Sequence, residues 1–368
     1  MTLTNYWWLL IWIFVGGFIL SQFPRRLELV QGNPEERWSI PAAIMLVVPY
    51  IIWTGFRDDS FGDTAVYRYT FLNTPSDFSE WGDYLASIPK DRGFAVIRLV
   101  IKSLVGNSDV AFFLIIGAIQ ILCVCLVFRK YSCDYWLSIF VFVASMDYLS
   151  WTWNGIRQFL AIAIIFTAAG FIAKKKFVPA IIIVLLAATI HLSALIMIPG
   201  IFIIQGRAWN KRAVVAIVIS VIALIFVQQF TGILDFLLED TQYEGVVSNW
   251  ESLGDDGANP VRALIYSIPT ILSVIGYRWI KTEPDPMIHI AVNASILCTA
   301  LYIIAIGTSG IFMGRLPGYV SLYATGILLP WEIHNIFEKD TARVIKFVTV
   351  VFYVVFFYYQ MSVVWHAI

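Results

Sequence analysis

Charged side chains are scarce in this sequence of 368 residues. Asp, Glu, Lys and Arg make up 14% of it, whereas an average soluble domain contains about 25%. Hydrophobic types reach 59%, and the mean hydropathy is +0.77. The 25 basic and 25 acidic residues cancel, so net charge indicates no partner of either sign. This composition excludes a secreted enzyme, a nucleic-acid binder and a receptor with one span and a large domain.

Cysteine is rare as well, and no cysteine has metal-ligand spacing with a histidine. We therefore expect all four cysteines to pack as apolar side chains. They are Cys123, Cys125, Cys133 and Cys298.

Long apolar runs recur from Trp7 to Trp365. A bilayer core about 30 Å thick needs about 20 apolar residues per helical span, and runs without alternation argue against a β-barrel. No basic residue precedes Tyr6–Leu20, which predicts a first span rather than a cleavable signal. The sequence predicts an all-α polytopic membrane protein, with residues 1–368 forming a single transmembrane domain of about twelve helices. The expected spans are 6–22, 39–56, 109–128, 135–150, 155–173, 177–190, 192–205, 213–230, 262–280, 287–307, 316–333 and 344–365.

The run Phe177–Ile204 is either one long span or two short spans broken at His191. Lys and Arg concentrate in cytoplasmic loops. With two spans and an outer N-terminus, every inner loop carries two or three basic residues, such as Lys174–Lys176. A single span would move every later loop to the opposite side of the membrane and place Arg207, Lys211 and Arg212 outside. We therefore predict the break at His191.

Two longer loops then fall on the outer side, at 57–108 and at 231–261, and the second is acidic. Loops of this length are often lids or binding loops. Within the first loop, Phe94–Val105 is apolar but short, and Arg98 and Lys102 share one helical face. We expect an interfacial amphipathic helix there. Because the inner loops are short, we expect the chemistry on the outer side.

The segment Asn154-Gly155-Ile156-Arg157-Gln158 carries the first candidate site. Asn154 predicts an N-cap, which places Arg157 in the first turn of a helix whose N-terminus attracts anions. A guanidinium group adds two parallel hydrogen bonds to a phosphate or carboxylate. Alternatively, Arg157 pairs with Asp147 or reaches the lipid headgroups.

His191 is the second candidate, because imidazole titrates near neutrality and suits proton transfer. Its alternative role is that of a membrane-interface residue at the end of a span.

Further arginines stand at other outer span ends. Arg315 lies in Gly314-Arg315-Leu316-Pro317-Gly318-Tyr319, where irregular backbone either lines a cavity or forms a plain turn. Arg57 opens the first outer loop, and Arg262 is a lesser candidate. Asp58 and Asp59 follow Arg57 but are only a weak cation signal.

These residues resemble those of the bacterial polysaccharide polymerases of the Wzy type, in particular the EpsG-like branch. The resemblance spans nearly the whole chain. One departure is Asp91-Arg92-Gly93-Phe94, where the family often has a glutamate before the glycine, so Asp91 receives little weight. The segments that carry the resemblance are Arg57 with Gly62-Asp63 and Tyr67, Asn154 to Gln158 with Ala161, Lys174 to Phe177, His191 to Leu195, and Arg315 with Tyr319.

The resemblance implies a GT-C-like glycosyltransferase that joins oligosaccharide repeat units carried on undecaprenyl pyrophosphate, at the outer face of the inner membrane. It implies that Arg157, Arg315 and Arg57 bind the pyrophosphate, and that His191 or Asp63 acts as base or orients the acceptor hydroxyl. Asn154, Gln158, Tyr67, Tyr319 and Arg262 would support the site. It further implies no metal or other cofactor, and a chain-length regulator as a plausible partner.

Two other functions remain open from the sequence. A flippase or transporter of lipid-linked sugars also uses charged residues near membrane depth, although no internal repeat is evident and the candidate residues lie on one side. A ligase of the same lipid-linked glycan class is closer to the main hypothesis. A membrane acyltransferase with His191 as base would release no pyrophosphate.

Overall fold

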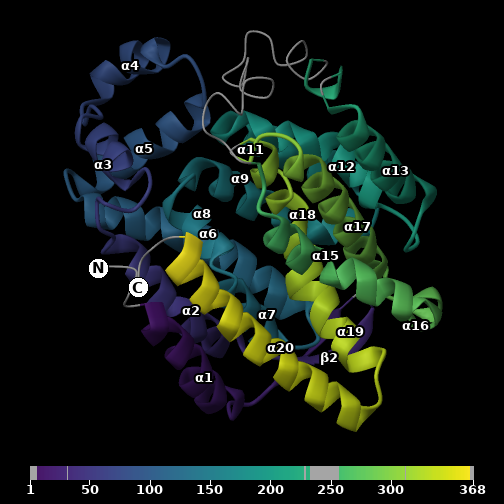
Figure 1. Ribbon diagram of the computed structural model, residues 1–368. Coiled ribbons are helices and arrows are strands. Elements are labelled where there is room, and N and C mark those ends of the chain that lie inside the picture. Colours follow the sequence, from purple (N-terminus) through teal and green to yellow (C-terminus); the bar gives the residue numbers. More distant parts are fainter. Residues whose placement is uncertain (1–5, 31, 228, 233–256, 311, 365–368) are drawn as a thin grey trace. The chain divides into compact units, whose positions relative to one another are not determined.

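The computed structural model describes residues 6–30, 32–227, 229–232, 257–310 and 312–364. Most of these residues are helical (Figure 1), and the described strands form one antiparallel hairpin of β1 (Arg26–Val30) and β2 (Asn33–Arg37). Most of the predicted second outer loop, 231–261, lies outside the described residues. The prediction of an all-α membrane protein is confirmed.

Among the described residues, three helices are long and apolar enough to cross a bilayer. They are α6 (Asp109–Tyr131), α17 (Pro286–Ile306) and the run Lys339–Val364, which comprises α20 (Lys339–Tyr359) and the π-helix η7 (Gln360–Val364). Shorter apolar helices occupy most of the other predicted spans.

The chain divides into two compact units. The first comprises Met1–Ile172, Lys176–Met197 and Asp340–Ile368, and the second comprises Ala173–Lys175 and Ile198–Lys339.

The first unit contains most of the helices that surround the candidate residues. Here α2 (Ile40–Gly55) packs closely on α6 because Gly117 faces Thr54: a Cβ added at Gly117 would lie 2.1 Å from Thr54 Oγ1. Small residues at such crossings let membrane helices approach closely. Other helices of this unit are α1 (Trp7–Ser21), α7 (Tyr135–Ala144), α8 (Asp147–Trp153), α9 (Ile156–Phe166), α10 (Ala169–Ala173), α11 (Phe177–Ile190) and η3 (Leu192–Ile196).

Two predicted spans of this unit, 135–150 and 155–173, are not continuous helices. The first breaks after Ala144, because Met146 adopts a left-handed conformation (φ 62°) before α8 begins. The second breaks after Phe166, and α10 follows. The predicted break at His191 is confirmed: α11 ends at Ile190, and His191 is extended (φ −154°, ψ 119°).

The first outer loop folds into α3 (Thr64–Leu72), η2 (Phe78–Glu80), α4 (Trp81–Ser87) and α5 (Arg92–Val105), which group together in Figure 1. Buried side chains of α3 and α5 join those of α6, α9 and α11 in one apolar cluster, and α4 packs on α5. Within it, the Phe71 and Phe112 rings stack with centroids 4.4 Å apart. The loop is therefore a packed substructure of the first unit.

The predicted helix at 94–105 exists as α5. We expected its charged face to lie at the membrane interface, but this face packs against the protein. Arg98 and Lys102 are buried, whereas Val96, Val100 and Leu104 are exposed. Lys102 Nζ donates to Leu72 O at 2.9 Å and so caps the C-terminus of α3. The charged face thus makes contacts inside the protein and does not face water at a membrane interface.

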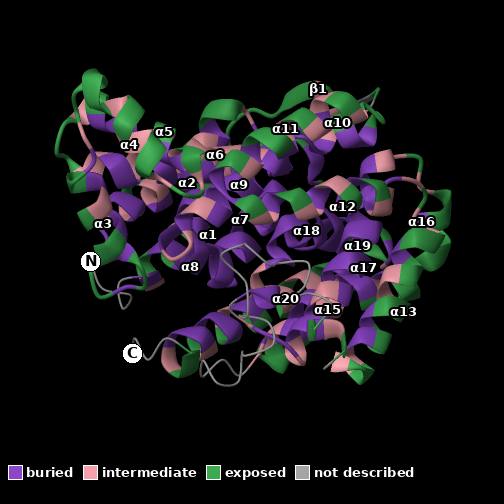
Figure 2. Cartoon of the chain, turned by 90° about the horizontal axis from the view of Figure 1, so that it is seen from above, coloured by how far each residue is buried: buried purple, intermediate pink, exposed green. Residues whose placement is uncertain are grey.

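The second unit is arranged around α17, which is largely buried, as Figure 2 shows. Asn293 on this helix donates to Ile204 O (3.1 Å) and Arg207 O (3.0 Å), and so holds the loop after α12. The other helices are α12 (Met197–Ile204), α13 (Lys211–Ile225), α15 (Pro260–Ile275), α16 (Tyr277–Thr282), η5 (Met313–Arg315), α18 (Gly318–Tyr323), the π-helix η6 (Ala324–Leu328) and α19 (Leu329–Asn335).

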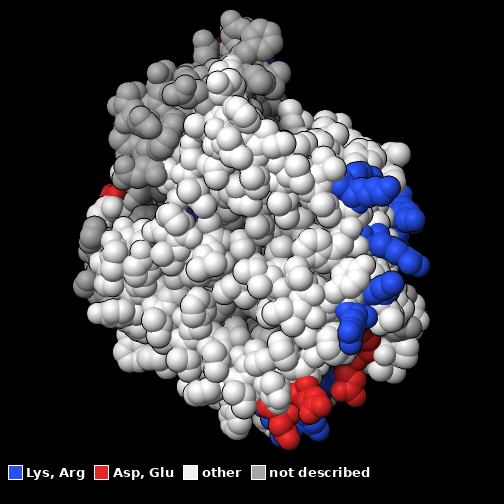
Figure 3. All heavy atoms as spheres, turned by 45° about the vertical axis from the view of Figure 1, so that its right-hand side comes forward, with Lys and Arg blue, Asp and Glu red and all other residues white. Residues whose placement is uncertain are grey.

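Charged side chains are unevenly spread over the surface. On the face drawn in Figure 3, Lys, Arg, Asp and Glu gather along one margin, and most of the remaining described surface carries no charge. Helix α13 exposes Val215, Val218, Ile222 and Ile225. Such an apolar exterior is expected where side chains contact lipid tails.

Candidate functional site

The break between α8 and α9 places Arg157. Gly155 occupies the N-cap position of α9 in a left-handed conformation (φ 84°), which glycine adopts readily. The prediction that Asn154 caps this helix is wrong, because Gly155 starts α9 and Asn154 is instead the extended C-cap residue of α8. Arg157 does lie in the first turn of α9, as predicted. Asn154 contacts the first outer loop, since a Cβ at Gly62 would lie 2.7 Å from Asn154 Cγ.

Asp91 is the ion-pair partner of Arg157, with Arg157 Nη1 2.6 Å from Asp91 Oδ2. The N–H of Leu192 also donates to this carboxylate. Asp91 therefore ties the start of α5 to the start of α9 and to the turn after His191. The close approach of α5 to α11 depends on Gly93, whose added Cβ would lie 2.1 Å from Thr189 Oγ1.

A cavity of about 200 Å³ opens beside this ion pair. It is smaller than the roughly 300–1,000 Å³ of typical pockets for drug-sized ligands, so it suits a compact group such as a pyrophosphate rather than an oligosaccharide. Its lining residues are Val66, Tyr67, Thr70, Ile88, Lys90, Asp91, Phe94, Ala95, Arg98 and Arg157.

Arg98 is the second buried guanidinium at this cavity, with 7% of its surface exposed. It donates to the hydroxyl of Tyr84, and its Nε has no hydrogen-bond partner among the described residues. Burial lowers the pKa of Arg98, but a guanidinium group remains protonated in proteins. Arg98 therefore brings a permanent positive charge to the cavity.

The electrostatics of Asp91 are set mainly by burial. Burial raises the pKa of this carboxyl group above its ordinary value, and the nearby Arg157 counteracts only part of that shift. The ionised carboxylate is therefore less favourable here than in water.

His191 is buried and belongs to a short hydrogen-bond chain. Its Nδ1 lies 2.7 Å from Ser193 Oγ, and Gln158 Nε2 donates to the same Oγ at 3.3 Å. Because a hydroxyl oxygen accepts two hydrogen bonds, either Ser193 donates to Nδ1 or Nδ1–H donates to Ser193, depending on the imidazole tautomer.

Arg57 is enclosed by backbone and aromatic rings, with 3% of its surface exposed. Its Nε donates to Thr54 O (2.8 Å) and its Nη1 to Trp153 O (3.3 Å), and its guanidinium lies 4.1 Å from the Phe113 ring centroid. Burial lowers the pKa of Arg57 to about 9, so the group stays charged at neutral pH. Arg57 thus connects the end of α2 to the end of α8.

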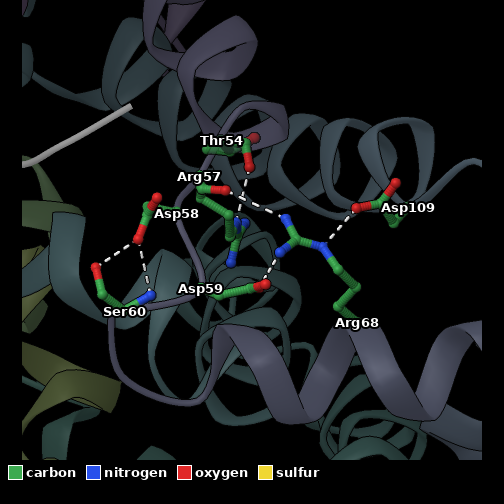
Figure 4. A network of polar contacts seen from close by, with 7 residues as sticks. All are labelled: Thr54, Arg57, Asp58, Asp59, Ser60, Arg68 and Asp109. Carbon is green, nitrogen blue, oxygen red and sulfur yellow. Dashed lines mark hydrogen bonds and ion pairs between the residues drawn. The ribbon is translucent and has the colours of Figure 1, made fainter.

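A second network, drawn in Figure 4, holds the loop that follows Arg57. Arg68 donates to Arg57 O at 3.2 Å and to Asp109 Oδ2 at 2.5 Å, and it pairs with Asp59. Asp58 accepts from the backbone and hydroxyl of Ser60. Asp63 is exposed at the start of α3.

Three predicted residues belong to the second unit. Arg262 lies in the first turn of α15 and Arg315 in η5; both are partly exposed, whereas Tyr319 is 2% exposed. A Cβ at Gly314 would lie 3.6 Å from the Cβ of Ala258, just before α15. The structure therefore brings Arg262 and Arg315 to the same end of this unit.

Sequence reasoning missed Asp91 and Arg98. Asp91 received little weight because it departs from the glutamate expected there, and Arg98 was assigned to an interfacial helix. The burial of both at one cavity depends on the packing of α5 against α9 and α11, which no local pattern reveals. The Asp-x-Gly start of α5 is the one signal that could have drawn attention to Asp91.

These features define a helical membrane protein with a small cavity lined by Lys90, Arg98 and Arg157 together with Asp91. The chain belongs to the EpsG family, whose family model matches residues 42–366. This membership indicates a polysaccharide polymerase role. No curated protein and no solved structure matches the chain.

Proposed function

We propose that this protein is a GT-C-like glycosyltransferase, with about twelve spans, that polymerises repeat units carried on undecaprenyl pyrophosphate at the outer face of the inner membrane. The observation that carries the proposal is the pair of guanidinium groups, Arg157 and Arg98, at one small cavity. Fixed cations of this kind bind a pyrophosphate and stabilise the charge that develops as it leaves.

The proposed reaction exchanges one bond for another at the anomeric carbon of the growing chain. The bond from this carbon to the pyrophosphate oxygen breaks, and a bond to a hydroxyl oxygen of the next lipid-linked unit forms. The hydroxyl proton passes to a base, and the lipid pyrophosphate departs with its charge held by the arginines. Positioning and charge stabilisation are then the main contributions of the protein.

His191 and Asp63 are the proposed groups for the acceptor side. The hydrogen bond between His191 Nδ1 and Ser193 Oγ holds the imidazole ring in place, so that its Nε2 can orient the acceptor hydroxyl. Asp63 is exposed and adjoins Gly62, which contacts Asn154, so it is our proposed base.

The other predicted residues take supporting roles in this proposal. Tyr67 lines the same cavity and would contact the pyrophosphate or its sugar. The contacts of Arg57 suit it to hold the α8–α9 break that positions Arg157. The pyrophosphate-binding role of Arg315, with Arg262 and Tyr319 in support, stays a prediction from the resemblance.

The proposed mechanism needs no metal ion, because arginines would neutralise the leaving group. Among the described residues, no three His, Cys, Asp or Glu side chains come together as a ligand set. We expect polymerisation to be unaffected by EDTA. Activity that disappears in EDTA and returns with Mg²⁺ would contradict this part of the proposal.

The test is polymerisation by the purified protein with its lipid-linked repeat unit. Wild type should produce a ladder of glycan lengths, whereas Arg157→Ala should lose about 10²-fold or more in rate, the usual cost of losing a group that stabilises transition-state charge. His191→Ala should also be impaired. The matched control is Arg92→Gln, on the exposed face of α5, which should retain activity.

The opposing outcomes separate the competing functions. Movement of the lipid-linked unit across liposomes without any ladder would support the transporter instead. Transfer to a different acceptor without chain growth would support the ligase.

A further inference from the structure

The cavity beside Arg157 contains one carboxylate among three cations. The side chain of Asp91 is 4% exposed, and that of Arg157 is 33% exposed. Arg98 is buried and Lys90 is exposed at the rim. Three positive groups against one negative group leave a net formal charge of +2.

The proposed reaction changes the charge of the ligand. A pyrophosphate that joins a lipid to a sugar is a diester with two ionised oxygens. When the sugar leaves, the lipid pyrophosphate becomes a monoester, and its terminal phosphate acquires an additional charge, because the second ionisation of a phosphate group has a pKa near 6. The product is thus more negative than the substrate at the same place.

On the basis of the proposed function, we propose that Asp91 is a specificity-determining residue whose carboxylate lowers the affinity of the cavity for the released monoester relative to the intact diester. Coulomb energy scales with the product of the charges. A fixed negative charge therefore repels a trivalent anion more than a divalent one. This discrimination favours release of the product before the next repeat unit binds.

The contacts of Asp91 keep this charge in place. Its carboxylate is held by Arg157 Nη1 at 2.6 Å and by the N–H of Leu192. Its backbone is left-handed, with φ 55° and ψ 38°, a conformation in which Asp and Asn are enriched. Asp91→Asn therefore removes the charge while preserving both the size of the side chain and the backbone preference.

The experiment measures a ratio of two affinities by titration calorimetry on the purified full-length protein at pH 8. The probes are farnesyl pyrophosphate and its terminal methyl ester, which share the lipid tail and differ by one ionisable oxygen. The ratio of the affinity for the monoester to the affinity for the diester should be about fivefold or more higher in Asp91→Asn than in wild type. One extra charge pair about 4 Å apart is worth about that factor even in bulk water.

Two variants check that charge is responsible. Asp91→Glu keeps the carboxylate and should keep the wild-type ratio. Asp83→Asn removes a carboxylate on α4, in an exposed position, where solvent and salt screen it. It should also leave the ratio unchanged.

A substitution that removes a positive charge instead of a negative one gives a second measurement, in which Asp91 is unchanged. Arg98→Gln removes a positive charge from the cavity and should shift the ratio toward the diester. Arg92→Gln, on the exposed face of the same helix, should not. The affinity ratio should thus shift in opposite directions in Asp91→Asn and Arg98→Gln. A merely structural role of either residue would not produce this result.

The outcomes distinguish this inference from the proposed function. An unchanged ratio in Asp91→Asn, with both probes still bound, overturns the inference and leaves the pyrophosphate site standing, whatever Arg98→Gln does. Equal weakening of both probes also overturns it. Failure of wild type to bind either probe overturns the pyrophosphate site and the inference together.

Discussion

The Asp91 carboxyl group is buried beside Arg157, and burial raises its pKa above the ordinary value. Between the ordinary pKa and the raised folded-state pKa, the folded protein binds more protons than the unfolded chain does. Stability therefore falls as pH rises through this window, and the full cost of the ionised carboxylate is present above the folded-state pKa.

This linkage gives a prediction for Asp91→Asn that needs no activity assay. The variant lacks the titrating group, so the difference in melting temperature, variant minus wild type, should become more positive from pH 4 to pH 7.5. The attraction of Arg157 is already included in this net shift, because Arg157 lowers the pKa of Asp91 and burial raises it by more. The measurement is a thermal melt of both proteins in the same detergent.

A matched melt of Asp58→Asn should stay nearly flat from pH 4 to pH 7.5, because the ordinary pKa of 3.8 and the lowered folded-state pKa both lie below this range. Hydrogen bonds from Ser60 lower the pKa of Asp58, so its stabilising effect is present above the ordinary pKa and is lost as pH falls through the folded-state pKa. Parallel curves for the two variants would contradict the assignment of Asp91 as a carboxyl group whose pKa is raised by burial.

Single residues were predictable from the sequence where a local rule applies. Arg157 was placed in a first helical turn because Asn154 predicted a helix start just before it, and His191 was placed at a break because the charge of the loops required one. Asp91 was not predictable, because its partner lies 66 positions away and its role depends on three helices meeting. Asn154 was assigned as a cap because its type favours that position, but Gly155 starts the helix.

At the scale of elements, the contact between α5 and α11 positions Asp91. A Cβ at Gly93 would lie 2.1 Å from Thr189 Oγ1 and 2.8 Å from the Thr189 carbonyl carbon, so backbone as well as side chain would have to move. Gly93→Val should therefore destabilise the protein by about 1–3 kcal/mol, as overpacking usually does, and should reduce polymerisation by displacing Asp91.

The measurement is thermal stability together with activity in the same detergent preparation. The matched control is Gly82→Ala on α4, where an added Cβ meets nothing within 4 Å, and which should change neither quantity. Wild-type stability and activity in Gly93→Val would show that the spacing of these helices does not position the site.

The helices themselves followed from apolar periodicity, but their interruptions did not. The breaks at Met146 and after Phe166 lie within apolar runs that predict continuous spans, and only tertiary packing selects them. The sequence correctly predicted that the charged residues of α5 share one face of the helix. It wrongly predicted that this face is exposed. Lys102 is buried because it caps α3, a partner that a helical wheel cannot identify.

At the scale of the whole molecule, the scarcity of charge was enough to predict a helical membrane protein. It was not enough to predict the division of the chain into two compact units. The distribution of Lys and Arg predicts which side of the membrane each loop faces, and the proposed function requires α3, α4 and α5 to face outward.

Labelling of single cysteines in intact cells tests this orientation. Ser87→Cys at the end of α4 and Lys174→Cys after α10 both lie at exposed positions, and Cys133, which is exposed, would be replaced by Ser in both. An impermeant maleimide should label Cys at position 87 directly and Cys at position 174 only after the membrane is permeabilised. The three lysines at 174–176 favour the cytoplasmic side, and the loop that holds Asp91 would then face the compartment where lipid-linked units are joined. The reverse pattern would place the cavity on the cytoplasmic side and contradict polymerisation at the outer face, whatever the cavity binds.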